Sequence, residues 1–490
     1  MDFLDPEKQK AHSRRLALGY ALIGLVLVLA TTILLYVVYG FGLDKEGRVI
    51  QNGLVFVSSH PTGGTIYIDK KQYRDKTNTR VPLPAGQYVL ELARTGYGTW
   101  KRAITVEGGI VERFDYPLLY PSTLASATTK RYESSPAFTS NSHDRQWLLV
   151  GMPSSNDFDL YDLDVKKPTA TILKLNPDIL AAGSTTTNWE VVDWAANNRT
   201  VLLKRTYTRN GQPGTEYILL DRQDATAAQN LSVLFGFSPA NLSFNGRAQD
   251  KFYAFDPNNG QVLTVEIKKP TPQPYLSDVV AFVPDGDTVL YVTSANAPSG
   301  KVLVRMRQKL DAPYTIRQLP AGTQYLLKLG NYSNEMLAAA GASSDNKVYI
   351  YKNPIDALKE QPADGLAPIH ILKVDSPTYI SYSPNKRMFM AENGDQFAVY
   401  DAETDKGYAY KMDMSLDEPI PHASWMDGYR LNIVSGGKLV AFDFDGSNMR
   451  KLAAANPALL PGYDSSYRYM YTVNTEHDLI NTALLTPEDL

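Results

Sequence analysis

The stretch at residues 378–412, TYISYSPNKRMFMAENGDQFAVYDAETDKGYAYKM, sets the pattern for most of this chain. It contains four short runs of apolar and aromatic residues, YISYS, RMFMAE, FAVYD and YAYKM. The residues between the runs are rich in Asp, Asn, Gly and Pro, which favour tight turns. Short alternating runs bounded by such residues are typical of antiparallel strands. The stretch therefore predicts one four-stranded antiparallel sheet.

Related units follow one another along residues 131–490. A second clear unit contains the runs VVAFV, VLYVTS, VLVRM and YTIRQL, and NLSFNGRAQDKFYAFDPNNGQVLTVEI supplies the third unit. Eight units of roughly 28–50 residues have the period of propeller blades with four strands each. We therefore predict an all-β chain dominated by a β-propeller with eight blades, and seven blades are the alternative. The last unit ends at INTALL without a fourth strand, which we expect a segment near residues 121–131 to donate.

The turns of these units resemble those of known propeller repeats. SPNK, PDGD and AFDFDGSNMRKL are similar to turns in TolB-like and WD40-like repeats, although the GH…WD signature of WD40 blades is absent. The resemblance implies the fold and says little about function, because propellers serve many functions.

A smaller β domain is predicted at residues 44–119. Apolar and polar residues alternate in five runs, which are LVFVSS, TIYIDKK, QYVLELA, RAITVEG and VERFDYPLL. Turn residues separate these runs, so we predict five short strands in a small sandwich. Residues 120–130, YPSTLASATTK, are small and polar and are predicted to be a linker or the closing strand of the propeller.

This domain resembles the PEGA family. Residues 57–70, VSSHPTGGTIYIDK, are similar to the family's opening, in which Pro-Glu-Gly-Ala precedes an xIYIDG strand, although residues 61–64 read PTGG here. Residues 83–97, LPAGQYVLELARTGY, and residues 104–109, ITVEGG, continue the resemblance. It implies a prokaryotic extracytoplasmic β-sandwich that binds surface components or proteins and has no catalytic activity.

An apolar segment precedes both β regions. Residues 16–43, LALGYALIGLVLVLATTILLYVVYGFGL, contain no charged residue. About 20 apolar residues cross a bilayer, whereas a cleavable signal peptide has an apolar region of only ~7–15 residues. We therefore predict a retained transmembrane helix at residues 16–43 after a tail at residues 1–15. The aromatic residues Tyr36, Tyr39 and Phe41 would lie at the far interface.

Charged residues on the two sides of this segment predict its orientation. Four basic residues precede it, Lys8, Lys10, Arg14 and Arg15. The two basic residues that follow, Lys45 and Arg48, are interleaved with Asp44 and Glu46. The positive-inside rule then places the N-terminus in the cytoplasm and residues 44–490 outside it.

Composition narrows the functional classes. The 490 residues carry a formal net charge of −3, which argues against a general nucleic-acid-binding protein with its basic face. There are no cysteines, so disulfides, thiolate metal sites and cysteine nucleophiles are excluded. The absence of cysteine also favours a bacterial surface over a secreted eukaryotic protein, which would usually carry disulfides.

No sequence motif points to catalysis. The six histidines are His12, His60, His143, His370, His422 and His477, and none is paired at metal-ligand spacing. Walker A, dinucleotide-binding and G-x-S-x-G motifs are absent. Two acidic groups, Asp157-Asp159-Asp162-Asp164 and Asp443-Asp445, lack the complete calcium-loop pattern, so we interpret them as turns. Tyr97 and Trp100 are expected to pack in the small core, and a sugar-stacking platform is the alternative.

These observations predict a non-enzymatic, membrane-anchored binding or scaffold protein outside the cytoplasm. Its propeller would dock an envelope polysaccharide or a surface protein, through loops on a rigid scaffold. The alternative is a propeller-type polysaccharide hydrolase or lyase, whose carboxylates would converge in the central channel. We predict no cofactor, no metal site and no nucleic-acid partner, and the sequence names no catalytic or binding residue.

Overall fold

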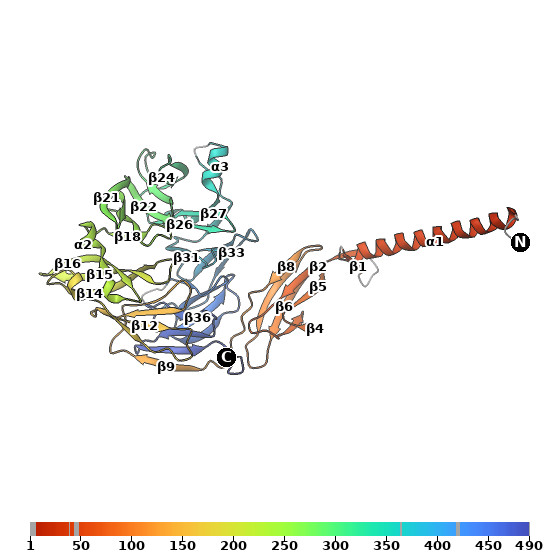
Figure 1. The fold of residues 1–490 in the computed structure, drawn as a ribbon, viewed down its shortest axis with the longest axis horizontal. Helices are drawn as coiled ribbons and strands as arrows, with labels where there is room; N and C mark the ends of the chain where they lie inside the picture. Colours follow the sequence, from red (N-terminus) through yellow and green to blue (C-terminus); the bar gives the residue numbers. More distant parts are fainter. Residues whose placement is uncertain (1–5, 39, 44–48, 363–364, 418–421, 490) are drawn as a thin grey trace. The chain divides into compact units, whose positions relative to one another are not determined.

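The computed structural model describes residues 6–38, 40–43, 49–362, 365–417 and 422–489. The chain forms two compact units. The first extends to Thr123 and includes Asp489, and the second covers Leu124–Glu488. Figure 1 shows an N-terminal helix and two β regions along the sequence.

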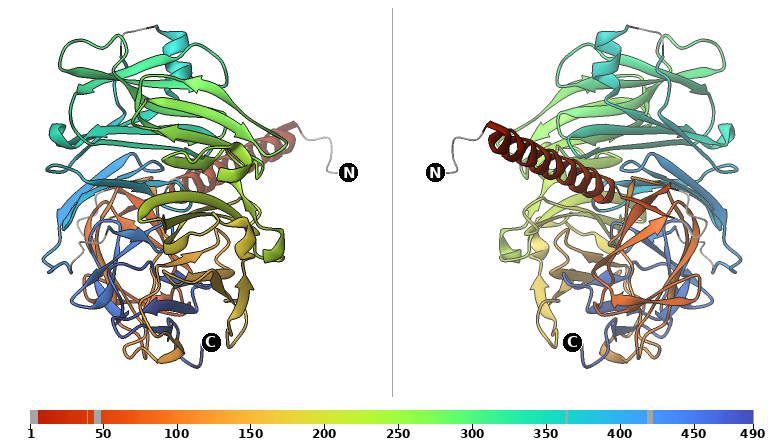
Figure 2. Two further views of the ribbon diagram at one scale, coloured as in Figure 1. Left: turned by 90° about the vertical axis from the view of Figure 1, so that its left-hand side faces the viewer. Right: turned by 90° about the vertical axis from the view of Figure 1, so that its right-hand side faces the viewer.

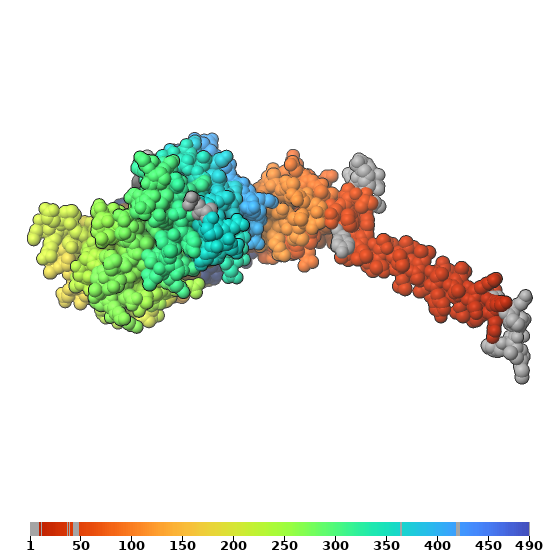
Figure 3. Space-filling view, turned by 90° about the horizontal axis from the view of Figure 1, so that it is seen from above, coloured from red at the N-terminus to blue at the C-terminus, as the bar shows by residue number. Residues whose placement is uncertain are grey.

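The N-terminal helix α1 covers Pro6–Val38. Among the described residues it is the one helix long and apolar enough to cross a membrane, over His12–Tyr36, and none of that stretch is buried. Apolar side chains along the helix, such as Leu18, Val26 and Leu34, are more than half exposed, and Figure 3 shows the helix in space-filling form.

The helix ends earlier than the predicted boundary at residue 43. Gly40 has a φ of 73°, a left-handed conformation that glycine adopts readily and that commonly ends a helix. After it, β1 (Phe41–Leu43) pairs with β2 (Val49–Val57). Phe41 is therefore in a strand, although its ring centroid lies 5.5 Å from that of Tyr36, and Tyr39 lies outside the described residues.

Two four-stranded sheets form the β part of the first unit. One sheet has the order β1-β2-β5, with β8 also paired to β2, and the other has the order β4-β3-β6-β7. The bounds not yet given are β3 (Thr65–Ile68), β4 (Lys71–Lys76), β5 (Thr79–Pro84), β6 (Gly86–Ala93), β7 (Trp100–Val106) and β8 (Val111–Phe114). Apolar side chains of both sheets, including Val55, Ile66 and Leu90, are fully buried and form the core between them.

The sequence predicted five of these strands and missed β1, β4 and β5. Strand β4, KQYRDK, has no fully buried residue and lies at a sheet edge, so it lacks the apolar alternation that marks a half-buried strand. Strand β5, TRVPLP, contains two prolines, and proline is a residue typical of turns. Its buried residue Val81 fixes which face points inward.

The second unit contains eight four-stranded antiparallel sheets among the described residues, which confirms the eight-bladed propeller. Blade 1 consists of β10 (Phe138–Asn141), β11 (Trp147–Gly151), β12 (Asp157–Asp162) and β13 (Thr171–Lys174), and blade 2 consists of β14 (Thr185–Trp194), β15 (Thr200–Arg209), β16 (Gln212–Asp221) and β17 (Gln229–Asn230). Blade 3 consists of β18 (Asn241–Phe244), β19 (Lys251–Asp256), β20 (Gln261–Glu266) and β21 (Lys269–Leu276), and blade 4 consists of β22 (Val279–Asp285), β23 (Thr288–Thr293), β24 (Lys301–Gln308) and β25 (Tyr314–Pro320).

Blades 5 to 8 complete the ring in the same way, and Figure 2 shows the sheets following one another around it in sequence order. Blade 5 consists of β26 (Tyr325–Tyr332), β27 (Glu335–Ala342), β28 (Lys347–Lys352) and β29 (His370–Lys373), and blade 6 consists of β30 (Tyr379–Tyr382), β31 (Met388–Asn393), β32 (Gln396–Asp401) and β33 (Lys406–Lys411). Blade 7 consists of β34 (Ser424–Trp425), β35 (Arg430–Ser435), β36 (Lys438–Asp443) and β37 (Arg450–Ala454), and blade 8 consists of β38 (Gly462–Tyr463), β39 (Tyr469–Val473), β40 (Asp478–Ala483) and β9 (Ser126–Arg131). Two short helices, α2 (Leu231–Phe235) and α3 (Pro354–Glu360), lie in connections.

The first strands of neighbouring blades face the propeller axis. Strand β10 contacts both β14 and β38, and β26 contacts both β22 and β30. The apolar cores lie between adjacent blades, as where Leu149 of blade 1 and Leu203 of blade 2 share one cluster. Each blade is therefore held by its two neighbours, and the inner strands are left to line the channel.

The ring closes where the sequence predicted. Strand β9, inside the predicted donor segment, pairs antiparallel with β40, from Ser126 opposite Thr482 to Arg131 opposite Asp478. The Arg131 guanidinium donates to both Asp478 carboxylate oxygens, at 2.7 and 2.9 Å. These bonds favour the ionised carboxylate and lower the pKa of Asp478.

Candidate functional site

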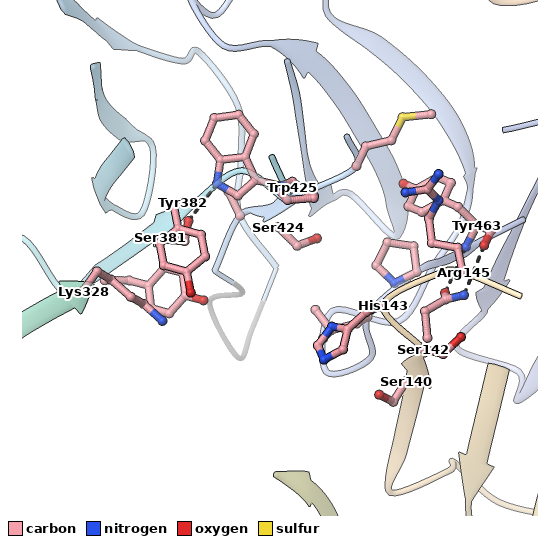
Figure 4. A pocket seen from close by; sticks show the side chains of 17 residues that line it. Ser140, Ser142, His143, Arg145, Lys328, Ser381, Tyr382, Ser424, Trp425 and Tyr463 are labelled. Atoms are coloured by element: carbon pink, nitrogen blue, oxygen red, sulfur yellow. Dashed lines mark hydrogen bonds between the residues drawn. The ribbon is translucent and has the colours of Figure 1, made fainter. Parts of the chain in front are cut away.

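A cavity of about 450 Å³ lies among the inner strands of blades 1, 5, 6, 7 and 8 (Figure 4). Its walls come from β10, β26, β30, β34 and β38 and from the turns beside them. The lining combines aromatic, hydroxyl and cationic side chains, chiefly Ser140, Ser142, His143, Arg145, Lys328, Tyr379, Ser381, Tyr382, Ser424, Trp425 and Tyr463. Because the inner strands surround the axis, this cavity occupies one side of the channel.

The aromatic side chains of the pocket are held by hydrogen bonds from neighbouring blades. The Trp425 indole N–H donates to the Ser381 hydroxyl at 3.0 Å, which joins blade 7 to blade 6. The Asn141 side chain bonds both backbone groups of Tyr463, at 3.1 and 3.0 Å, which joins blade 1 to blade 8. These bonds across blades fix the walls of the pocket before any ligand arrives.

Lys328 is the cation on the blade 5 wall. It has no hydrogen-bond or ion-pair partner among the residues that the structure describes. Its ammonium nitrogen lies 5.7 Å from the centroid of the Tyr382 ring, a cation–π distance. Burial lowers the pKa of Lys328, and the negative charge of Asp193 acts in the opposite direction.

Two further cationic groups come from the turn after β10. The Arg145 Nη2 donates to the Ser465 carbonyl oxygen at 2.9 Å, while its buried Nε has no hydrogen-bond partner in the described structure. The His143 Nε2 lies 2.8 Å from the Trp194 carbonyl oxygen and 3.4 Å from the Asp193 carboxylate. Its hydrogen bond with Asp193 raises the pKa of His143.

No carboxylate is among the described residues that line this pocket. Glu392 lies behind the wall, where its fully buried carboxylate accepts bonds from the Ala423 N–H at 3.1 Å and the His422 Nδ1 at 2.9 Å. This bond raises the pKa of His422, whose ring stacks on Tyr379 at 4.3 Å. Glycoside hydrolysis ordinarily needs two carboxyl groups flanking the bond, and the described lining residues include neither.

Tyr97 and Trp100 are buried in the first unit, as the core-packing interpretation predicts. Trp100 is only 2% exposed and Tyr97 only 7% exposed. The Trp100 ring centroid lies 5.9 Å from that of Tyr116 in an edge-on arrangement. Large aromatic side chains supply much of the apolar surface of a small core, and Trp100 does so here.

The acidic groups of the sequence have structural partners. Asp159 accepts an ion pair from Lys130 at 2.5 Å, and Asp445 accepts bonds from the backbone and hydroxyl of Ser447 in a turn. No group of three or more metal-ligating side chains occurs within the described residues. Of the six histidines, His143 lines the pocket and His422 lies directly beside Ala423 of its wall.

Comparisons with known proteins identify one matching family and several similar solved structures. Residues 52–119 match the PEGA domain family. No curated protein matches the sequence. Among solved structures, the chain is similar to the Dos1 propeller (10% identity, TM-score 0.43, 74% of this chain and 95% of that one) and to the β-propeller domain of Cps50 (Swd1) from Myceliophteria thermophila (14%, 0.39, 74% and 100%). It is also similar to Hsv2 from Kluyveromyces lactis (10%, 0.40, 64% and 93%).

Proposed function

We propose that this chain is a membrane-anchored, extracytoplasmic binding protein that docks an envelope component in its propeller channel without cleaving it. The observation that carries the proposal is the pocket lining, which joins aromatic rings, hydroxyls and cations from five blades and contains no carboxylate among the described residues. Pre-formed concave sites with a few placed polar groups are typical ligand sites. The absence of paired acids among the described lining residues disfavours the hydrolase alternative.

The remaining parts of the chain have supporting roles in this proposal. The apolar helix anchors the protein, with residues 1–15 in the cytoplasm, as the basic residues before it favour. The domain at residues 44–119 acts as a spacer or wall-contact module, which agrees with its match to the PEGA family. Residues 120–130 lead into the propeller, residues 131–490, which carries the docking site.

The test uses the full-length chain in detergent micelles and native envelope polysaccharide fixed to beads. Retention of the protein without release of sugars into the supernatant is expected, and Tyr382→Ala should abolish it. Tyr73→Ala, in β4 of the first unit, is the matched control and should be retained like the wild type. Released sugar fragments would establish an enzyme instead, and retention unchanged by Tyr382→Ala would exclude this pocket.

A protein partner is distinguished by a second arm. If no polysaccharide retains the chain, a photo-crosslinking amino acid at position 382 is irradiated in envelope extract. A single crosslinked protein, competed by the wild-type chain, would then identify a protein ligand of the same pocket. The absence of a competed crosslink would refute docking at this site.

A further inference from the structure

Lys328 stands out because it is the charged residue of an inner strand that also carries buried apolar side chains. In β26, YLLKLGNY, the neighbours Leu326 and Leu329 are buried at 6% and 2% exposure. Lys328 instead reaches the channel pocket, and Figure 4 shows it beside Tyr382. A lysine in such a half-buried position costs free energy unless an opposite charge compensates it.

The charged groups around Lys328 are already engaged with other partners. Asp193 on β14 lies 3.4 Å from His143. Asp285 on β22 lies 3.8 Å from the ammonium group of Lys386 and accepts a hydrogen bond from Asn331 at 3.0 Å. No acidic side chain among the described residues comes within ion-pair distance of Lys328, so its charge is available to an incoming anion.

The Tyr382 hydroxyl is the second available donor. It has no hydrogen-bond partner among the described residues, although its ring contacts the ammonium groups of Lys328 and Lys386 at 5.7 and 5.4 Å. An ammonium and a phenol on one wall present N–H and O–H donors to the same acceptor. Two donors, one of them charged, match the oxygens of a carboxylate or phosphate.

From this arrangement we infer that the pocket binds an acidic saccharide, whose carboxylate or phosphate group is recognised jointly by Lys328 and Tyr382; the inference rests on the proposed docking function. The other walls are suited to the rest of a sugar. The ring of Trp425 offers an apolar face, and hydroxyls of Ser140 and Ser381 lie on the lining. A sugar carries both an apolar ring face and hydroxyls, which match these two kinds of lining group.

The direct test measures binding of fluorescent tetragalacturonate to the full-length chain in detergent. Its uncharged methyl ester serves as the matched ligand, and a glutamate decapeptide serves as the acidic peptide. The acid should bind roughly tenfold or more tightly than the ester, because hydrogen bonds to charged groups are the stronger ones. Raising the salt concentration should weaken binding of the acid and leave that of the ester unchanged.

Three variants test whether Lys328 and Tyr382 cause the tighter binding of the acid than of the ester. Lys328→Met should lower the affinity for the acid to that for the ester and leave the ester unaffected, which also shows that the variant is folded. Tyr382→Phe keeps the ring and removes the hydroxyl, so the affinity for the acid should fall by only a few fold. Lys301→Met, an exposed lysine at the start of β24, is the control and should bind like the wild type.

The outcomes separate this inference from the proposed function. If the acid and the ester bind with equal affinity and both lose binding in Trp425→Ala, the pocket binds a saccharide, and the inference that it recognises an acidic group is refuted. If the glutamate peptide binds more tightly than tetragalacturonate and its binding depends on Lys328, the inference of a saccharide ligand is refuted, and the ligand is an acidic protein segment. No binding of any probe would overturn the inference by itself, while retention on native polysaccharide decides the docking function separately.

Discussion

Blade 2 contains a buried ion pair, and replacing either partner alone should lower the free energy of unfolding more than replacing both. The Arg205 and Glu216 side chains, opposite each other on β15 and β16, are only 2% and 3% exposed. Arg205 donates to Glu216 at 2.5 Å, to Thr186 at 2.8 Å and to Ser184 at 3.0 Å. Asn230 donates to the other Glu216 oxygen at 2.6 Å. Either single replacement therefore leaves a buried charge without its counter-charge.

The expected magnitudes follow from this geometry. Arg205→Met and Glu216→Leu should each lower the free energy of unfolding by about 3–5 kcal/mol, because each leaves the buried charge of the other partner unpaired. The double variant Arg205→Met/Glu216→Leu strands no charge and should cost only about 1–3 kcal/mol, for the hydrogen bonds lost. The two single costs sum to about 6–10 kcal/mol, so the two positions should show a coupling energy of at least about 3 kcal/mol.

Urea unfolding of the full-length chain in detergent would measure these values through tryptophan fluorescence. Trp189 and Trp194 belong to the same blade and are buried, so they report its unfolding directly. Arg199→Met is the control, since Arg199 pairs with Asp221 in the same blade but is exposed, and little change is expected. Single variants that cost under about 1 kcal/mol, or a double variant that costs their sum, would refute the argument.

Two further predictions concern the closing strand and the small core. Asp478→Asn should destabilise the ring only at a pH at which the wild-type carboxylate is ionised. Arg131 lowers the pKa of Asp478. The extra stability of the wild type over the variant is therefore present above pH 3.8 and disappears as the pH falls through the lowered pKa. Thermal unfolding between pH 7 and pH 2 would check this, and an equal difference at both ends would contradict it. Trp100→Ala should destabilise the first unit by about 3–5 kcal/mol, through the cavity it leaves. Hydrogen exchange should accelerate in β6 and β7 while saccharide binding is unchanged, and lost binding with unaltered exchange would restore Trp100 as a ligand contact.

The blades could be predicted because each one repeats the same local pattern. In blade 6, the alternation in YISYS, RMFMAE, FAVYD and YAYKM corresponds to β30 to β33, each bounded by turn residues. Strands without that alternation escaped prediction. The polar edge strand β4 and the proline-containing β5 acquire their strand character from pairing with β3 and β2, which no local pattern records.

The pocket could not be predicted for a different reason. Its lining comes from five blades, and Asn141 and Tyr463 are hydrogen-bonded between adjacent blades although they are 322 positions apart in sequence. One signal was present, because Lys328 interrupts the apolar run of YLLKLGNY at the inner strand of a blade. Without the register of that strand, this lysine is indistinguishable from a solvent-exposed one.

Closure of the ring by β9 has a consequence for the biogenesis of the protein. Arg131 and Asp478, which meet in the closing blade, are 347 positions apart in the chain, so a ribosome adding about 5–20 residues per second needs roughly 20–70 s between them. During that interval β9 has been made and its partner strand has not, and an unpaired strand invites association with other chains. The sequence of β9, SATTKR, is polar and basic, with no aromatic or large aliphatic residue. The polar and basic side chains of β9 thus disfavour association with other chains during the time in which its partner strand β40 has not yet been synthesised.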